Sequence, residues 1–172
     1  MKKFLWLTVC TVGLVGCGQT PPAEITLAPA TAGFLASAPM DRIAEGTDNT
    51  TVRVYKMVTG EDGTPTRAEV TGAKCTLESD HLKATVVTPQ EVILPNYDQN
   101  AEYEDRGVPP SILVTCTAGD LTGTQLLAAK PGAIYTGGSG NLLVDLIVIA
   151  GSAAVANTSD WRYQPSVDVV VE

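Results

Sequence analysis

Short apolar runs, several of them alternating with polar residues, fill the middle and the end of this chain. Such alternation is typical of β-strands, because successive side chains of a strand point to opposite faces of its sheet. Turns that contain glycine and proline separate the runs, as at residues 60–65. The pattern predicts an all-β fold, a small antiparallel β-sandwich. The predicted strands are residues 50–59, 69–77, 84–88, 91–94, 111–118, 123–130 and 167–171.

The start of the chain has a different pattern. Lys2 and Lys3 precede an uncharged apolar stretch at residues 4–15, and small residues follow it. This order is typical of an export signal, and the stretch is shorter than the roughly 20 residues that a membrane-spanning helix needs. We therefore predict a signal peptide at residues 1–16. The alternative is an N-terminal membrane anchor that is never cut.

Residues 14–17, Leu-Val-Gly-Cys, resemble the lipobox of bacterial lipoprotein precursors. The resemblance implies cleavage before Cys17, diacylglycerol on its sulfur, and a further acyl chain, such as palmitate, on its new amine. Several acyl chains anchor a protein stably, whereas one does so only marginally. Gly18 in place of an aspartate implies, by the same resemblance, the outer membrane, with the domain facing the periplasm or the cell surface. We expect no cofactor apart from this covalent lipid.

The organisation of the mature chain follows from composition. Residues 18–49 are rich in Ala, Pro, Thr and Gly. We expect residues 17–49 to be the lipidated cysteine and a flexible, disordered tether, whose ends would lie about 30 Å apart. The β-domain should occupy residues 50–135. Residues 136–172 should contribute a glycine-rich lead-in, an apolar segment and a final strand, packed on the same domain.

The apolar segment, residues 142–156, is interrupted by Asp145 and Gly151. Its length and its charge disfavour a membrane-spanning helix. We expect a core strand or a short buried helix of the same domain. The alternative is a glycine-zipper-like hairpin, in which small residues permit close helix approach. That alternative would make the protein an oligomerising envelope component.

The net charge of the chain limits the classes of partner that we expect. The chain has 11 basic and 19 acidic residues, a net charge of −8 at pH 7. Loss of Lys2 and Lys3 with the signal would leave nine basic residues against 19 acidic ones, a net charge of −10. Such a surface repels nucleic acid, so we expect no nucleic-acid partner. The expected partners are membrane lipid through the anchor, and an envelope protein or the cell wall.

The four cysteines separate by position. Cys10 lies in the signal and Cys17 would carry lipid. Cys75 and Cys116 both lie in β-like runs, in a compartment that permits disulfides. We predict that they form a disulfide that pins two strands together across the core and stabilises the fold by about 4 kcal/mol. The alternative is two free buried thiols. No zinc site is expected, because His81 is the sole histidine and no CxxC motif occurs.

A second resemblance covers residues 50–123. Residues 51–54 (TVRV), 72–77 (GAKCTL), 88–92 (TPQEV) and 113–116 (LVTC) resemble a pattern in small envelope lipoproteins of unassigned role. In those proteins the strands build a β-domain similar to PEGA domains. The resemblance implies a binding or structural module and no catalytic residues.

Four aromatic residues are the candidates for ligand binding. Aromatic side chains at loop tips could stack on sugars or on the side chains of a partner. This would make the protein a carbohydrate- or peptidoglycan-binding lipoprotein. The candidates are Tyr97, Tyr103, Trp161 and Tyr163.

Residues 96–110 are expected to form a polar loop, here called the acidic loop, with oxygen-bearing side chains at alternate positions, namely Asp98, Asn100 and Glu102. Calcium prefers such ligands, but Tyr103 stands where the EF-hand pattern requires glycine. We therefore expect a solvated loop and no metal. An envelope enzyme with an unfamiliar site would have to use carboxylates such as Asp98, Glu102 and Asp105.

No catalytic motif is recognisable. Ser79 and Asp80 directly precede His81, and neighbours on one strand point to opposite faces, so they cannot form a triad. Ser139 lies in a GGSGN sequence that lacks the G-x-S-x-G context. The sequence therefore predicts a lipid-anchored cell-envelope lipoprotein that is not an enzyme and acts as a structural or adaptor-like binding module.

Overall fold

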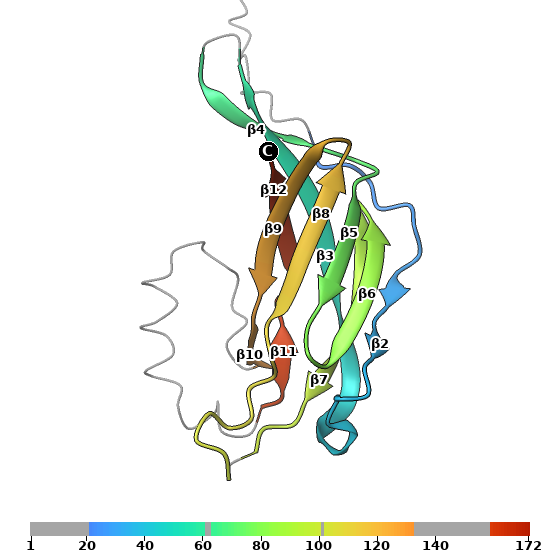
Figure 1. Cartoon of the computed structure of the whole chain (residues 1–172), viewed down its shortest axis with the longest axis vertical. Helices are drawn as coiled ribbons and strands as arrows, with labels where there is room; N and C mark the ends of the chain where they lie inside the picture. Colours follow the sequence, from blue (N-terminus) through green and yellow to red (C-terminus); the bar gives the residue numbers. More distant parts are fainter. Residues whose placement is uncertain (1–20, 61–62, 101, 133–158) are drawn as a thin grey trace, which may run out of the picture.

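Thirteen elements make up the computed structural model, which describes residues 21–60, 63–100, 102–132 and 159–172 (Figure 1). One is a 3-10 turn, η1 Met40–Arg42. The others are strands: β1 Ala30–Thr31, β2 Gly33–Phe34, β3 Ile43–Thr59, β4 Pro65–Glu69, β5 Lys74–Glu78, β6 Leu82–Val87, β7 Gln90–Tyr97, β8 Ile112–Ala118, β9 Leu121–Leu127, β10 Ala129–Pro131, β11 Trp161–Tyr163 and β12 Ser166–Val171.

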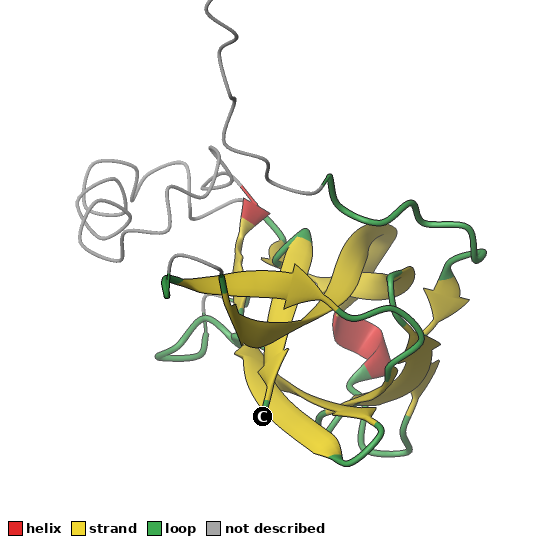
Figure 2. Cartoon of the chain, turned by 90° about the horizontal axis from the view of Figure 1, so that it is seen from above, coloured by secondary structure: helices red, strands yellow, loops and turns green. Residues whose placement is uncertain are grey.

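The strands form two sheets that pack face to face, so the predicted all-β sandwich is confirmed (Figure 2). The larger sheet has the order β10-β11-β7-β3-β12, with β1 beside β7 and β4 beside β3. The smaller sheet has the order β2-β6-β5-β8-β9. Most neighbours are antiparallel as expected, but β12 runs parallel to β3 and β1 runs parallel to β7.

Alternation along the strands builds the core between the sheets. In β6 and β8 every second side chain is buried, and the residues between them face outward. Burial of this aliphatic surface is the main term that holds the sheets together. The largest fully buried side chains are Tyr97, Leu77, Leu82, Leu94, Ile112, Leu127, Val52, Val54, Val86, Val92, Val114 and Val169.

The predicted disulfide between Cys75 and Cys116 is confirmed. The two residues are direct cross-strand partners in β5 and β8, with Cα atoms 4.1 Å apart, and both are completely buried. The bond therefore joins neighbouring strands of one sheet. The expectation that it would pin strands together across the core is wrong in this respect.

Strand β3 begins earlier than predicted. Residues 43–49 have no apolar alternation, yet they continue the strand because they pair with β7, with a register irregularity between Ile43 and Thr47. Gly46 lies in this irregularity with φ of 116°, a conformation that favours glycine. The second half of β3 pairs with β12 on one side and with β4 on the other. This one strand thus connects most of the larger sheet.

Other boundaries also differ from prediction. The strand expected at residues 69–77 is two strands, β4 and β5, separated by a turn in which Gly72 has φ of 76°. No strand was predicted at residues 161–163, yet they form β11, because Trp161 to Tyr163 pair with β10. The acidic loop begins after Tyr97 because β7 continues to that residue. The apolar segment at residues 142–156 lies outside the described residues.

The N-terminal region differs most from its prediction. Of the predicted flexible tether at residues 18–49, residues 18–20 lie outside the described residues, whereas residues 21–49 belong to the folded domain, because β1 pairs with β7 and β2 pairs with β6. We call residues 23–35 the strap. The strap passes from the edge of one sheet to the edge of the other and closes that side of the sandwich (Figure 1). Its backbone hydrogen bonds to strand edges, which composition does not reveal, explain why the prediction failed.

The opposite side of the sandwich closes differently. There β9 approaches β12, and the N–H groups of Thr122 and Glu172 each donate to the carbonyl oxygen of the other, at 3.2 and 3.1 Å. Gly123 makes this approach possible. A Cβ atom at this position would overlap the carbonyl oxygen of Val170 and lie 3.1 Å from Cγ1 of Val169.

Candidate functional site

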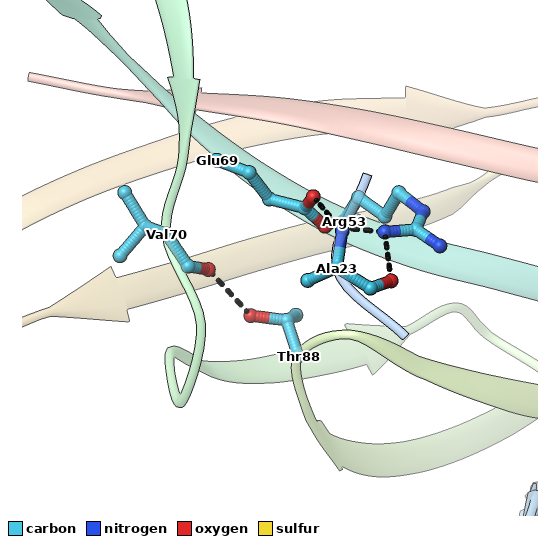
Figure 3. Close-up of polar contacts among 5 residues, drawn as sticks. All are labelled: Ala23, Arg53, Glu69, Val70 and Thr88. Carbon is cyan, nitrogen blue, oxygen red and sulfur yellow. Dashed lines mark hydrogen bonds and ion pairs between the residues drawn. The ribbon is translucent and has the colours of Figure 1, made fainter. Parts of the chain in front are cut away.

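The strap is fixed at its start by a polar clamp formed by Ala23, Arg53 and Glu69 (Figure 3). The N–H of Ala23 donates to Oε2 of Glu69 at 2.7 Å, and Nη1 of Arg53 donates to the carbonyl oxygen of Ala23 at 2.9 Å. Arg53 and Glu69 also form an ion pair, with side chains only 16% and 13% exposed. Such charge-assisted bonds, partly shielded from water, are stronger than neutral ones. The clamp therefore holds one residue of the strap by both its donor and its acceptor.

Further bonds follow along the strap. Nε2 of Gln90 donates to the carbonyl oxygen of Ala28 at 2.7 Å. The N–H of Ala32 donates to the Ile93 carbonyl at 3.2 Å, and the N–H of Leu35 donates to the His81 carbonyl at 2.8 Å. Residues 23–35 are thus a part of the folded domain rather than a linker.

Nearby, Thr88 closes the turn between β4 and β5. Its side chain is buried, and its hydroxyl donates to the Val70 carbonyl at 3.2 Å (Figure 3). The N–H groups of Gly72 and Thr88 complete the arrangement by bonding to the Thr88 and Ala73 carbonyls at 2.6 and 2.9 Å. The end of the domain beside the clamp is therefore well ordered by hydrogen bonds.

The aromatic candidates lie at the opposite end of the domain, and two of them belong to the core. Tyr97 is completely buried and Tyr163 is 3% exposed, with ring centroids 6.4 Å apart in an edge-to-face arrangement. The Tyr163 hydroxyl donates to the Pro110 carbonyl at 3.0 Å. The Tyr97 hydroxyl has no hydrogen-bond partner among the described residues. The expectation that these two side chains bind a ligand at the surface is wrong, because folding buries them.

Burial also changes the acidity of this pair. It raises the pKa of Tyr97 to about 12, against a smaller lowering effect of the Arg42 charge. Burial likewise raises the pKa of Tyr163, and the neighbouring Tyr97 adds to the effect. Both phenols are therefore neutral over the physiological pH range.

The other two aromatic candidates are partly accessible. The indole Nε1–H of Trp161 donates to the Arg106 carbonyl at 3.1 Å, which fixes the acidic loop against β11. Tyr103 is 53% exposed, and the guanidinium carbon of Arg42 lies 5.6 Å from the centroid of its ring. Among the four candidates, Tyr103 alone presents a largely open ring.

The acidic loop uses its polar groups internally. Oδ1 of Asn100 accepts the N–H of Glu102 at 3.0 Å, and Oδ1 of Asp105 accepts the N–H of Gly107 at 2.8 Å. Arg42 donates to the carbonyl oxygens of Asp98, at 3.2 Å, and of Gly107. Within the described part of the chain, no three His, Cys, Asp or Glu side chains gather as metal ligands would. Of the three oxygen-bearing side chains considered for calcium, that of Asn100 is thus already a hydrogen-bond acceptor within the loop.

His81 is a packing residue beside Tyr97. The two ring centroids are 5.8 Å apart, and burial lowers the pKa of His81, with Asp80 raising it and Arg42 lowering it to smaller extents. The Ser79 hydroxyl accepts the N–H groups of His81 and Leu82, at 3.3 and 3.2 Å, and so shapes the turn before β6. Ser139 lies outside the described residues.

The surface of the described residues has shallow openings, and two of them lie near charged side chains. One, of about 260 Å³, lies between the β4–β5 and β8–β9 turns, with Lys56 as its charged group. The other, of about 230 Å³, lies beside Asp48 and Arg162, whose side chains approach to 3.6 Å. Neither opening combines a nucleophile, a base and an anion-stabilising group, the constellation that a hydrolytic site needs.

Sequence reasoning did not single out the clamp. Arg53 is the polar residue that alternates with Val52 and Val54, which indicates only that it faces away from the core. Its partners are Glu69 on the next strand and a backbone group of Ala23, thirty residues away. No local pattern encodes such a contact.

Searches of protein families, curated proteins and solved structures find no significant match to this chain. No helix among the described residues is long and apolar enough to cross a membrane.

Proposed function

We propose that this protein is a lipid-anchored lipoprotein of the cell envelope, and that its β-sandwich is a structural or adaptor-like binding module rather than an enzyme. The observation that carries the proposal is the sequence before Cys17. Two lysines, an uncharged apolar stretch and Leu-Val-Gly-Cys follow one another in the order of a lipoprotein signal.

The fold is consistent with this location. A buried disulfide between Cys75 and Cys116 suits an oxidising compartment outside the cytoplasm. The first contact of the folded domain is at Ala23, six positions after the cysteine that would carry lipid. The non-enzymatic part of the proposal is supported by the internal use of the polar groups on the acidic loop.

The intact mass of the protein, taken without reduction from the membrane fraction, tests the proposal. We expect a chain that starts at Cys17, with the mass of its acyl chains added and two hydrogens missing for the disulfide. A Cys17→Ser variant, as control, should carry no lipid, so its mass spectrum should lack the acylated form. An unlipidated mass for the unaltered protein would refute the anchor.

Binding to the cell wall is a second candidate, favoured only by the exposed ring of Tyr103. Open aromatic rings are typical contact surfaces for sugars and partner side chains. A Tyr103→Ala variant should then bind purified cell-wall sacculi less well than the unaltered protein. Equal sedimentation of both proteins with sacculi, or of neither, would rule this candidate out.

A further inference from the structure

We propose that the clamp holds the domain close to the bilayer, with the hairpin of β3 and β4 directed toward the phospholipid surface. This inference rests on the proposed function, since it requires lipid on Cys17. Six positions separate Cys17 from Ala23, and the clamp fixes Ala23 by hydrogen bonds at both its N–H and its carbonyl. Six residues span about 20 Å at full extension. The sandwich therefore cannot drift freely on a long tether.

The position of the clamp sets the orientation. Glu69 is the last residue of β4, and Arg53 lies on β3 close to where the hairpin begins. From this point the hairpin projects beyond the body of the sandwich, at the end where the strap also begins (Figure 1). Its paired part runs from Tyr55 to Thr59, about 14 Å at the rise of an antiparallel strand. We call the residues between Cys17 and Ala23 the linker. The paired part of the hairpin and the extended linker are comparable in length, so the hairpin can reach the plane of the lipid head groups.

The hairpin carries an exposed apolar side chain beside a cationic one. Met57 is 52% exposed, and its cross-strand partner Arg67 is also exposed. A flexible apolar side chain beside a long cationic one can enter the interface while the charge remains hydrated. Lys56 and Arg67 are balanced by two acidic residues in the sequence of the hairpin tip. The contact therefore does not require anionic lipid.

The opposite end faces away from the membrane in this arrangement. The acidic loop, with Tyr103 and Glu104, lies at the far end of the sandwich from the hairpin (Figure 1). The exposed ring of Tyr103 would then be presented to the space beyond the membrane rather than to lipid. Any partner that binds this end would meet the domain at a fixed distance from the bilayer.

Fluorescence quenching by lipids tests the orientation. In the lipidated protein Cys75 and Cys116 are paired and Cys17 is acylated, so one engineered thiol can be labelled specifically. Met57→Cys and Glu104→Cys proteins would be labelled with the same dye. Both would be reconstituted into zwitterionic vesicles that contain head-group spin-labelled phospholipid. We expect quenching at position 57 to be at least twice that at position 104. Equal quenching of the two dyes would overturn the inference.

Two further variants isolate the clamp and the linker. Ten Gly/Ser residues inserted after Gly18 leave every described contact intact and should reduce quenching at position 57 to the level seen at position 104. Glu69→Ala should reduce it partly, because the next side-chain bond on the strap is at Ala28. Asp48→Ala, which breaks the ion pair with Arg162 on the same sheet, is the matched control and should change nothing. Unchanged quenching after the insertion would contradict the inference.

The inference and the proposed function fail in different ways. Loss of acyl mass on the unaltered protein refutes the lipoprotein proposal itself. Correct acyl mass with equal quenching at positions 57 and 104 leaves that proposal standing and refutes only the orientation.

Discussion

The two sides on which the sheets meet are closed in contrasting ways. On one side the strap adds two short strands, β1 and β2, each of two residues, to the edges of β7 and β6. On the other side two full strands, β9 and β12, approach so closely that Gly123 packs directly against the backbone of Val170. Both arrangements protect strand edges that would otherwise be open to other chains.

The two sides should differ in how well they tolerate a local change in structure. The strap is held by separated hydrogen bonds, so one contact can change while its neighbours stay in place. The β9–β12 side depends on close packing of backbone against backbone, where an added atom has no room. We infer that the first side tolerates a local change of the strap, whereas the second side is the rigid part of the sandwich.

Loss of the disulfide should have the largest effect on the stability of the sandwich. Cys75 and Cys116 join β5 to β8, in the sheet that both sides close upon, and they are 41 residues apart in the chain. A Cys75→Ala/Cys116→Ala protein should lose about 4 kcal/mol of unfolding free energy in the chain-entropy description. Urea unfolding of the oxidised protein and the variant measures this loss. Two separate transitions in the variant would show that the two sides are not one cooperative unit.

Adding one methyl group on each side of the sandwich should change the stability of the protein by different amounts. Gly123→Ala places Cβ against the Val170 carbonyl and should destabilise the protein by about 3 kcal/mol. Gly33→Ala is the matched control on the strap side. There a Cβ would meet only the Lys83 carbonyl oxygen, at 3.8 Å, and the change should stay within about 0.5 kcal/mol. Equal effects in thermal unfolding would remove the contrast between the sides.

The sequence predicts the two sides unequally well. Strand β8 was predicted almost to the residue, because Ile112, Val114 and Cys116 alternate with outward-facing residues. The strap was mistaken for a tether, because its strands are two residues long and gain their partners from distant parts of the chain. Periodicity reports which face of a strand is buried, but it does not report which edge a short segment will join.

The candidate site shows the same limit. The pairing of Cys75 with Cys116 could be predicted because few cysteines remain and both lie in strand-like runs. Tyr97 and Tyr163 could not be separated from Tyr103 by residue type alone. The continuation of β7 and the presence of β11 bury the first two, whereas the third lies on an open loop.

Removal of the Tyr163 hydroxyl should have a moderate effect. Tyr163 pairs with Ala129 of β10, which follows β9 in the chain, and its hydroxyl donates to Pro110. A Tyr163→Phe protein should lose about 1 kcal/mol of stability, because a partly buried carbonyl loses its donor. Tyr103→Phe, at an exposed ring, should change stability by less than about 0.5 kcal/mol. If both substitutions have the same effect in urea unfolding, the Tyr163 bond does not stabilise the fold.

Removal of the Tyr97 hydroxyl should have the smallest effect at neutral pH, since this buried group has no hydrogen-bond partner among the described residues. Tyr97 contacts His81, whose carbonyl holds the end of the strap. A Tyr97→Phe protein should match or slightly exceed the stability of the unaltered protein at pH 7, because no bond is lost and an unpaired polar group is removed.

At alkaline pH the ionisation of Tyr97 should lower the stability of the protein. The folded-state pKa of Tyr97 is raised to about 12, above the ordinary value of 10.0. The phenol therefore ionises more readily in the unfolded chain, so stability is unaffected below pH 10 and falls as pH rises toward 12. Between these values the unaltered protein should lose up to about 1 kcal/mol per pH unit more than Tyr97→Phe does. The variant keeps the alkaline loss that comes from Tyr163, whose pKa is also raised by burial. Identical pH profiles of the two proteins in urea unfolding would mean that Tyr97 ionises as readily in the folded chain as in the unfolded one, and that the core beneath the end of the strap is open to water.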